Sequence, residues 1–94
     1  MSKSNQSKLN IPTETEAVIY RANGRIEYVK PNNGYKFTVE ELEEIVGGNI
    51  ESMSLLRKFN IIFNEHGSLS PEIRPNLAFP QFCGDIVICN PNSW

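Results

Sequence analysis

Residues that build metal centres are scarce in this chain of 94 residues, which contains one histidine and two cysteines. A zinc site needs four ligands, for example two closely spaced cysteine pairs, and the second half of such a pattern is missing. We therefore expect no metal and no other cofactor. Cys83 and Cys89 are expected on one strand, about 20 Å apart, which is too far for a disulfide bond. The sequence predicts two buried thiols in a reducing cytosol.

Positive charge and long apolar runs are also lacking. Lysine and arginine together number 9 against 11 acidic residues, which gives a net charge of −2. A dedicated nucleic-acid binder needs clustered cations, so binding to nucleic acid is not expected. No apolar stretch approaches the roughly 20 residues that cross a bilayer, and the polar segment Met1–Asn10 does not resemble a signal peptide. We expect a cytoplasmic protein without membrane contact.

The residues that are present fit one small domain. Residues 1–13 are dominated by Ser, Asn, Gln and Lys and predict a flexible polar tail, whereas residues 14–94 predict a single folded domain. A chain of this length buries only about 60–65% of the surface that it exposes when unfolded, so its stability margin is small. Self-association into a homo-oligomer would be a natural way to add buried surface.

A β-hairpin is predicted at the start of the domain. Residues 14–22 and 25–30 are strand-like and flank the pair Asn23-Gly24. Asn-Gly is the preferred pair for a two-residue type I′ turn, because both residues tolerate positive φ. Pro31 and the Asn-Asn-Gly sequence that follows it then lead the chain out of the sheet.

The clearest helix is predicted over residues 38–47. Thr38 and Glu41 have the spacing of a capping box, and Gly47-Gly48 ends the segment. Phe37, which precedes the cap, is expected to pack against Leu42. One face carries the apolar stripe Val39, Leu42, Ile45 and Val46, and the other carries Glu40, Glu41, Glu43 and Glu44.

Three further strands are predicted over residues 49–56, 60–64 and 86–89, with Ile50 and either Met53 or Leu55 pointing inward. The continuous apolar run Ile86–Cys89 indicates a strand that is buried on both faces. Residues 68–82 contain three prolines, which exclude a regular central strand, and a short helical turn is predicted near residues 71–78. The predicted fold class is α+β: a small, mostly antiparallel sheet of about five strands packed by one helix.

The order of short motifs along the chain adds a resemblance. The motifs are Val-x-Pro-x-Asn-Gly at 29–34, Phe-Thr-Val-Glu-Glu-Leu-Glu at 37–43, Val-Gly-Gly-x-Ile-Glu at 46–51, Asn-Glu-x-Gly at 64–67, Pro-Asn-Leu-Ala at 75–78 and Gly-Asp-Ile-Val-Ile at 84–88. Together, over residues 15–90, they resemble a small family of unknown function carried by bacteriophages, prophages and mobile elements. The resemblance implies a cytoplasmic accessory protein in such a setting, and it brings no catalytic residues to this chain.

One group of residues has the chemistry to recognise a small ligand. Asn33 and Tyr35 offer amide hydrogen bonds and a stacking face, which suit a nucleobase or a ribose. Arg57, Arg74 and Asn76 suit phosphate contacts if the fold brings them together in a pocket at a subunit interface. These five residues form the candidate ligand site. The alternative is that the asparagines serve the turn and that Tyr35 belongs to the core.

Other polar residues have simpler structural explanations. His66 lies beside Glu65 at a predicted hairpin tip, where we expect exposure to solvent. The helix glutamates are expected to face water, and Gly47-Gly48-Asn49 follows a helix C-terminus, where the dipole disfavours phosphate. Asp85 belongs either to a turn or to a functional site at the mouth of a strand. No nucleophile, base and orienting group form a recognisable set, so an enzyme is not expected.

Two binding functions are therefore predicted. In the first, the chain binds and modulates a host protein, as an anti-defence protein would, through a sheet edge or the acidic helix. In the alternative, it sequesters a host nucleotide signal at the candidate ligand residues. A deep polar pocket that gathers arginines would favour the nucleotide, whereas a flat apolar patch would favour a protein partner.

Overall fold

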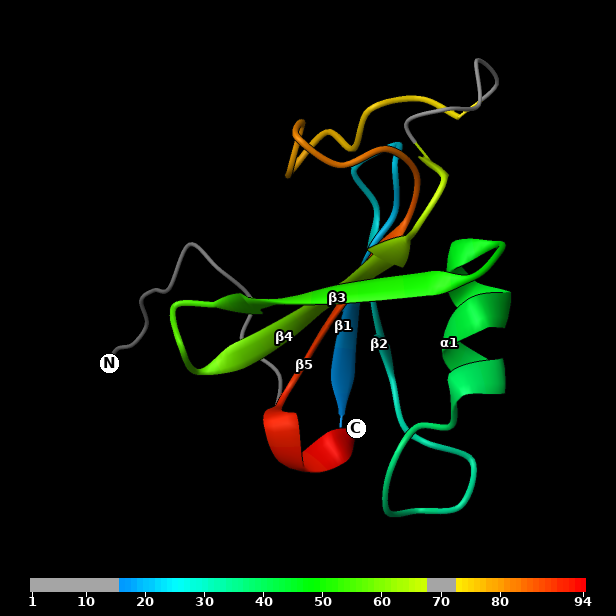
Figure 1. Cartoon of the computed structure of the whole chain (residues 1–94), viewed down its shortest axis with the longest axis vertical. Coiled ribbons are helices and arrows are strands. Elements are labelled where there is room, and N and C mark those ends of the chain that lie inside the picture. Colours follow the sequence, from blue (N-terminus) through cyan, green and yellow to red (C-terminus); the bar gives the residue numbers. More distant parts are fainter. Residues whose placement is uncertain (1–15, 68–72) are drawn as a thin grey trace.

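Residues 16–67 and 73–94 are described by the structure, a computed structural model, and the predicted tail of residues 1–13 lies outside them. The described chain forms an open five-stranded sheet in the order β2-β1-β5-β4-β3, and every neighbouring pair of strands is antiparallel (Figure 1). The elements are β1 (Ala17–Tyr20), β2 (Ile26–Val29), α1 (Val39–Val46), β3 (Ile50–Leu55), β4 (Phe59–Asn64), β5 (Ile86–Cys89) and the 3-10 helix η3 (Pro91–Ser93). The predicted α+β fold class is confirmed.

The two inner strands β1 and β5 carry the core. Every residue of both strands is buried, as the apolar run predicted for β5. Because strand side chains alternate, each strand serves two clusters. Ile19 and Val87 face α1, whereas Val18 and Ile88 belong to a second cluster on the opposite face. The sheet therefore needs cover on both sides, and α1 supplies it on one side only (Figure 1).

Helix α1 begins with the predicted capping box. The Glu41 N–H donates to Thr38 Oγ1 over 3.1 Å, and the Thr38 N–H donates to Glu41 Oε1 over 2.9 Å. The helix ends at Gly47, whose φ of +82° suits a residue without a Cβ. Leu42 and Val46 are buried as predicted, but Val39 is exposed, so the buried stripe is narrower than the sequence pattern suggested.

The first hairpin is confirmed, but its predicted turn type is wrong. Tyr20 pairs with Ile26, and the Arg21 N–H donates to Arg25 O over 2.8 Å, which leaves a three-residue loop. Among these residues only Gly24 has a positive φ, of +92°, whereas a type I′ turn requires two. The connection is instead a tight turn followed by a left-handed glycine, the usual form of a three-residue hairpin loop.

The type I′ geometry occurs at the β3–β4 connection. Leu56 and Arg57 have φ values of +56° and +59°, and the Lys58 N–H donates to Leu55 O over 3.0 Å. Neither a leucine nor an arginine favours this left-handed backbone, because the Cβ approaches the carbonyl oxygen. The tip of this hairpin therefore holds backbone strain.

The segment between β4 and β5 differs from its prediction. Part of the helical turn predicted near residues 71–78 lies outside the described residues, and residues 73–78 contain no helical turn; a short 3-10 turn is found at Pro91–Ser93. Cys83 is not on β5 with Cys89, because it forms an isolated bridge with Pro75 before the strand begins. On β3, Ile50 and Leu55 are partly buried, whereas Met53 is largely exposed.

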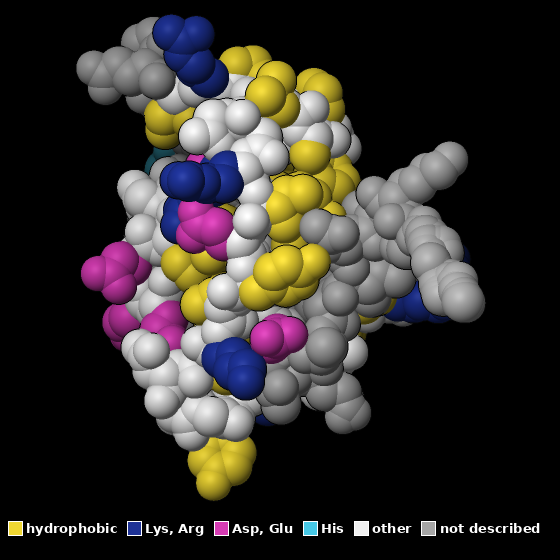
Figure 2. All heavy atoms as spheres, turned by 180° about the vertical axis from the view of Figure 1, so that it is seen from behind, with side chains coloured by type: hydrophobic (Ala, Val, Ile, Leu, Met, Phe, Trp, Pro, Cys, Tyr) yellow, Lys and Arg dark blue, Asp and Glu magenta, His cyan; other side chains and the backbone are white. Residues whose placement is uncertain are grey.

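Residues 73–85, called the β5 leader below, cover one end of the sheet face opposite α1. Phe79 lies edge-on to Tyr20 with ring centroids 5.1 Å apart, and Phe82 packs on Phe63 at 4.7 Å. Figure 2 views the molecule from behind and shows apolar side chains gathered in one band, with most of the visible acidic side chains on the flank beside it. On this side of the molecule the apolar band and most of the acidic side chains are thus separate.

Candidate functional site

An open cleft lies where the β1–β2 turn, the β5 leader and the end of α1 meet. Its volume is about 720 Å³, within the range of small-molecule binding pockets. Most of the lining is apolar, and Asn23, Arg74 and Asp85 supply its polar side chains. The lining residues are Ala22, Asn23, Val46, Ile73, Arg74, Pro75, Leu77, Gly84 and Asp85.

Asn76 fixes the wall of this cleft. Its side chain is only 1% exposed, and its amide Nδ2 donates to the carbonyl oxygens of Tyr20 and Gly84, both over 2.8 Å. Its Oδ1 accepts from the N–H groups of Ala78 and Phe79 over 3.0 and 3.1 Å. One buried side chain therefore ties the leader to the end of β1 and holds the two ends of the leader together, and it leaves none of its own amide groups unpaired.

The leader also contacts the hairpin turn directly. The Leu77 N–H donates to Ala22 O over 3.2 Å, and a Cβ on Gly24 would lie 3.1 Å from Leu77 Cδ1. Glycine at this position is required twice, by its positive φ and by this close approach. The Leu77 side chain nevertheless stays 70% exposed, so it presents a large apolar group at the rim of the cleft.

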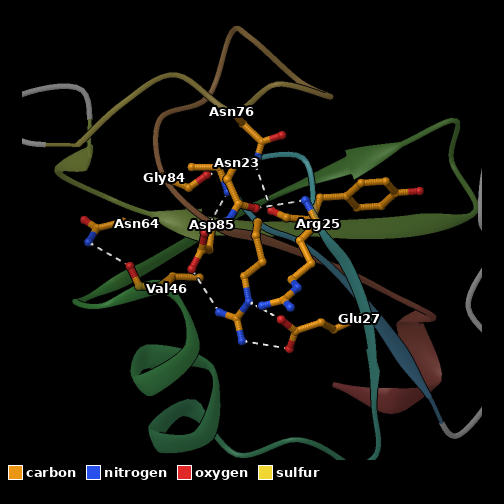
Figure 3. A network of polar contacts seen from close by, with 11 residues as sticks. Asn23, Arg25, Glu27, Val46, Asn64, Asn76, Gly84 and Asp85 are labelled. Atoms are coloured by element: carbon orange, nitrogen blue, oxygen red, sulfur yellow. Dashed lines mark hydrogen bonds and ion pairs between the residues drawn. The ribbon is translucent and has the colours of Figure 1, made fainter.

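A charged network borders the cleft on its other side. The Arg21 guanidinium donates to both oxygens of Glu27 over 3.0 Å and to Asp85 Oδ2 over 2.9 Å. Asp85 Oδ1 also accepts from the Ala22 N–H over 2.8 Å. Figure 3 shows Asp85 and Glu27 on different sides of the network, with Arg25 beside it. The network joins β1, β2 and β5 at the end of the sheet.

The ion pairs set the charge states of the network. Hydrogen bonding to Glu27 raises the pKa of Arg21 above its ordinary value, and hydrogen bonding to Arg21 lowers the pKa of Glu27. Arg21 and Glu27 are therefore both charged at neutral pH, and the Arg21 guanidinium is shared by the side chains of Glu27 and Asp85. In the described part of the chain, the Arg74 side chain forms no ion pair, so it is the cation in the cleft lining that a ligand can reach, whereas Arg25 lines a separate, smaller hollow beside Arg21 and Glu27.

The structure does not bring the five predicted ligand residues together within one chain. Asn33 caps its own turn, with Oδ1 accepting from the Tyr35 and Lys36 N–H groups over 2.8 and 3.0 Å. Tyr35 is 79% exposed, so the alternative that placed it in the core is wrong. The β2–α1 loop, the β3–β4 tip and the β5 leader lie at three separate ends of the molecule (Figure 1). Arg57 lies in the second of these regions, and Arg74 and Asn76 lie in the third.

Of the predicted ligand residues, only Arg74 lines the cleft. Sequence reasoning missed Arg21, Glu27 and Leu77, and it considered Asp85 only in outline. One signal was present: Arg21 and Glu27 are diagonal neighbours across the hairpin, and opposite charges at such positions interact. Leu77 carried no comparable signal, because only the folded leader places it beside the turn.

The remaining reactive groups are isolated. His66 and Glu65 contact each other over 3.0 Å at an exposed turn, as their position predicted. Cys89 is fully buried, and burial raises its thiol pKa to about 11. Among residues 16–67 and 73–94, no group of three or more His, Cys, Asp or Glu side chains is placed to hold a metal ion. None of the helices in this part of the chain has the length and apolar character that crossing a bilayer requires.

Comparison with protein-family models, curated proteins and solved structures finds no match to this chain.

Proposed function

We propose that this chain is a binding protein whose cleft accepts an apolar side chain from a segment of another protein. The observation that carries the proposal is the lining of the cleft, which is mostly apolar and has the exposed Leu77 at its rim. Apolar hollows with a few polar groups at the margin are typical of sites that anchor one large side chain. Arg74, the arginine in the cleft lining, favours an acidic residue next to that anchor.

A nucleotide is the less favoured occupant of the same cleft. Phosphate needs converging cations, but the guanidinium of Arg21 is already bound by two carboxylates. The Asp85 carboxylate, which also lines the cleft, would repel a phosphate group. The apolar lining could stack on a base. It offers few hydrogen bonds to replace those that the phosphate would lose to water on entering the cleft.

The wider biological setting stays a prediction. In this proposal the protein acts in the cytoplasm, has no catalytic step, and modulates a host protein on behalf of a phage or mobile element. The motif resemblance alone suggests that setting.

A peptide-display library tests the proposal directly. The full chain is immobilised and used to select random peptides, and we expect enrichment of sequences with a large apolar residue beside Asp or Glu. Leu77→Ser should weaken binding of the selected peptides by about tenfold or more, because a buried leucine contact contributes at least about 1.4 kcal/mol. Leu56→Ser is the matched control, since Leu56 is 69% exposed and lies at the far β3–β4 tip. If no peptide is enriched, or if both variants bind equally well, the proposal fails.

A thermal-shift screen tests the nucleotide alternative. A ligand at 100 times its Kd adds about 2.7 kcal/mol of stability, which raises Tm by about 10 °C or more in a domain of this size. We expect no such shift with mononucleotides or cyclic dinucleotides. A shift that Arg74→Ala abolishes would instead assign the cleft to a nucleotide.

A further inference from the structure

The two edges of the sheet differ in how they are protected against pairing with another strand. The β2 edge is four residues long, contains Glu27, and is followed directly by Lys30 and Pro31. Charged side chains, proline and short length are the usual features that block an exposed edge. The β3 edge is six residues long, carries one charged residue, Glu51, near its start, and has no proline within it or in the turn that follows it. Its four middle side chains are all exposed, and two of them are small serines that leave the backbone accessible.

Charge along β3 is arranged so that the strand complements itself. Glu51 lies near its start, Arg57 and Lys58 follow its end, and the middle is uncharged. Within the described residues, neither Glu51 nor Arg57 takes part in an ion pair. When two copies of such a strand run antiparallel, the acidic end of each lies beside the basic end of the other.

We propose that two copies of this chain pair antiparallel through β3, with Met53 of each copy at the two-fold axis. In this register Glu51 lies opposite Leu55 of the second copy and diagonal to Arg57 of the second copy, within reach of long side chains. The symmetry repeats each contact, so the interface contains two Glu51–Arg57 pairs. The result is a continuous ten-stranded sheet.

The register is constrained by the two faces of the sheet. Met53 pairs with Ile61 of β4 and shares its face, which is the face opposite α1. Pairing Met53 with Met53 keeps these faces on the same side of the joined sheet. A shift by one residue would place the helix-covered face of one copy beside the uncovered face of the other.

This pairing is independent of the proposed cleft function, because no residue of β3 lines the cleft. Sedimentation velocity on the full chain, from about 1 μM to about 1 mM, measures the dimer directly. Met53→Lys places two like charges opposite each other at the axis and should abolish the dimer. Tyr28→Lys is the matched control: Tyr28 is 55% exposed and Met53 is 51% exposed, and Tyr28 lies on the same sheet face at the opposite edge. This control should leave the dimer intact.

Charge reversal tests the register. Glu51→Lys or Arg57→Glu alone should raise the dimer Kd about tenfold, since each variant alters two symmetry-related pairs. The double variant should restore the Kd of the unmodified chain. A monomer at every concentration, a dimer that survives Met53→Lys, or a double variant as weak as the singles would overturn the proposal.

Discussion

Asn76 gives the sharpest prediction about how the cleft is built. Replacing Asn76 with Ala removes four hydrogen bonds to backbone groups, one at the end of β1 and three within the leader. Each such bond contributes about 1 kcal/mol net, and buried groups left unpaired cost at least as much. We therefore expect Asn76→Ala to lower the free energy of unfolding by about 4 kcal/mol. The whole stability of a small domain is about 5–15 kcal/mol, so this single change should remove a large part of it.

Urea unfolding followed by circular dichroism measures this loss. A decrease of about 4 kcal/mol corresponds to a fall in Tm of about 15–30 °C for a domain of this size. Asn33→Ala is the matched control, because Asn33 also accepts two backbone hydrogen bonds but lies in an exposed turn. There water replaces the lost acceptor, and the expected loss is below about 1 kcal/mol. Equal shifts of the urea midpoint for the two variants would refute the reasoning.

Three further predictions concern the helix cap, the thiols and the strained tip. Backbone hydrogen bonds from Thr38 and then Asn32 lower the pKa of Glu41 below its ordinary value of 4.5, so its contribution to stability is present above that pH and is lost as the pH falls through the folded pKa. Glu41→Gln should therefore differ most from the unmodified chain at neutral pH, and their urea midpoints should converge in acid. Cys89, with a pKa of about 11, should resist iodoacetamide at pH 8 in the folded chain while Cys83 reacts, and denaturant should expose both. Leu56→Asn should stabilise the fold by about 0.5–1 kcal/mol in thermal unfolding, because asparagine tolerates a positive φ better than leucine does. Leu56→Ala should give no such gain, because alanine keeps the Cβ and has no side-chain amide.

Most of the regular structure was predictable because its signals are local. The capping box of Thr38 and Glu41 and the glycine pair after Val46 define α1 within a few residues of chain. The apolar run at 86–89 identified a strand that is buried on both faces. The exception was the turn at Asn23-Gly24, where strand pairing between Tyr20 and Ile26 overrides the two-residue preference. A dipeptide such as Asn-Gly favours one turn type, but the pairing of the strands fixes how many residues the loop contains.

The site was far less predictable, because its contacts join distant parts of the chain. Asn76 bonds to Tyr20, 56 residues away, and Arg21 bonds to Asp85, 64 residues away. The sequence marked Asn76 as a polar residue suited to a ligand, whereas the folded chain uses all its hydrogen-bonding groups for its own backbone. Leu77 passed as an ordinary apolar residue in a proline-rich segment. Leu77 lies at the rim of the cleft only because the leader is hydrogen-bonded to the hairpin turn.

Chemical-shift mapping with a display-selected peptide tests the central claim, that the cleft at the end of the sheet binds a partner. The full chain is labelled with ¹⁵N and titrated with a selected peptide that carries an apolar residue beside an acidic one. The account predicts that the largest amide shifts fall on Asn23, Leu77, Gly84 and Asp85, and that Leu77→Ser removes them. Largest shifts at the β3–β4 tip or along the acidic face of α1, with the cleft amides unmoved, would contradict it.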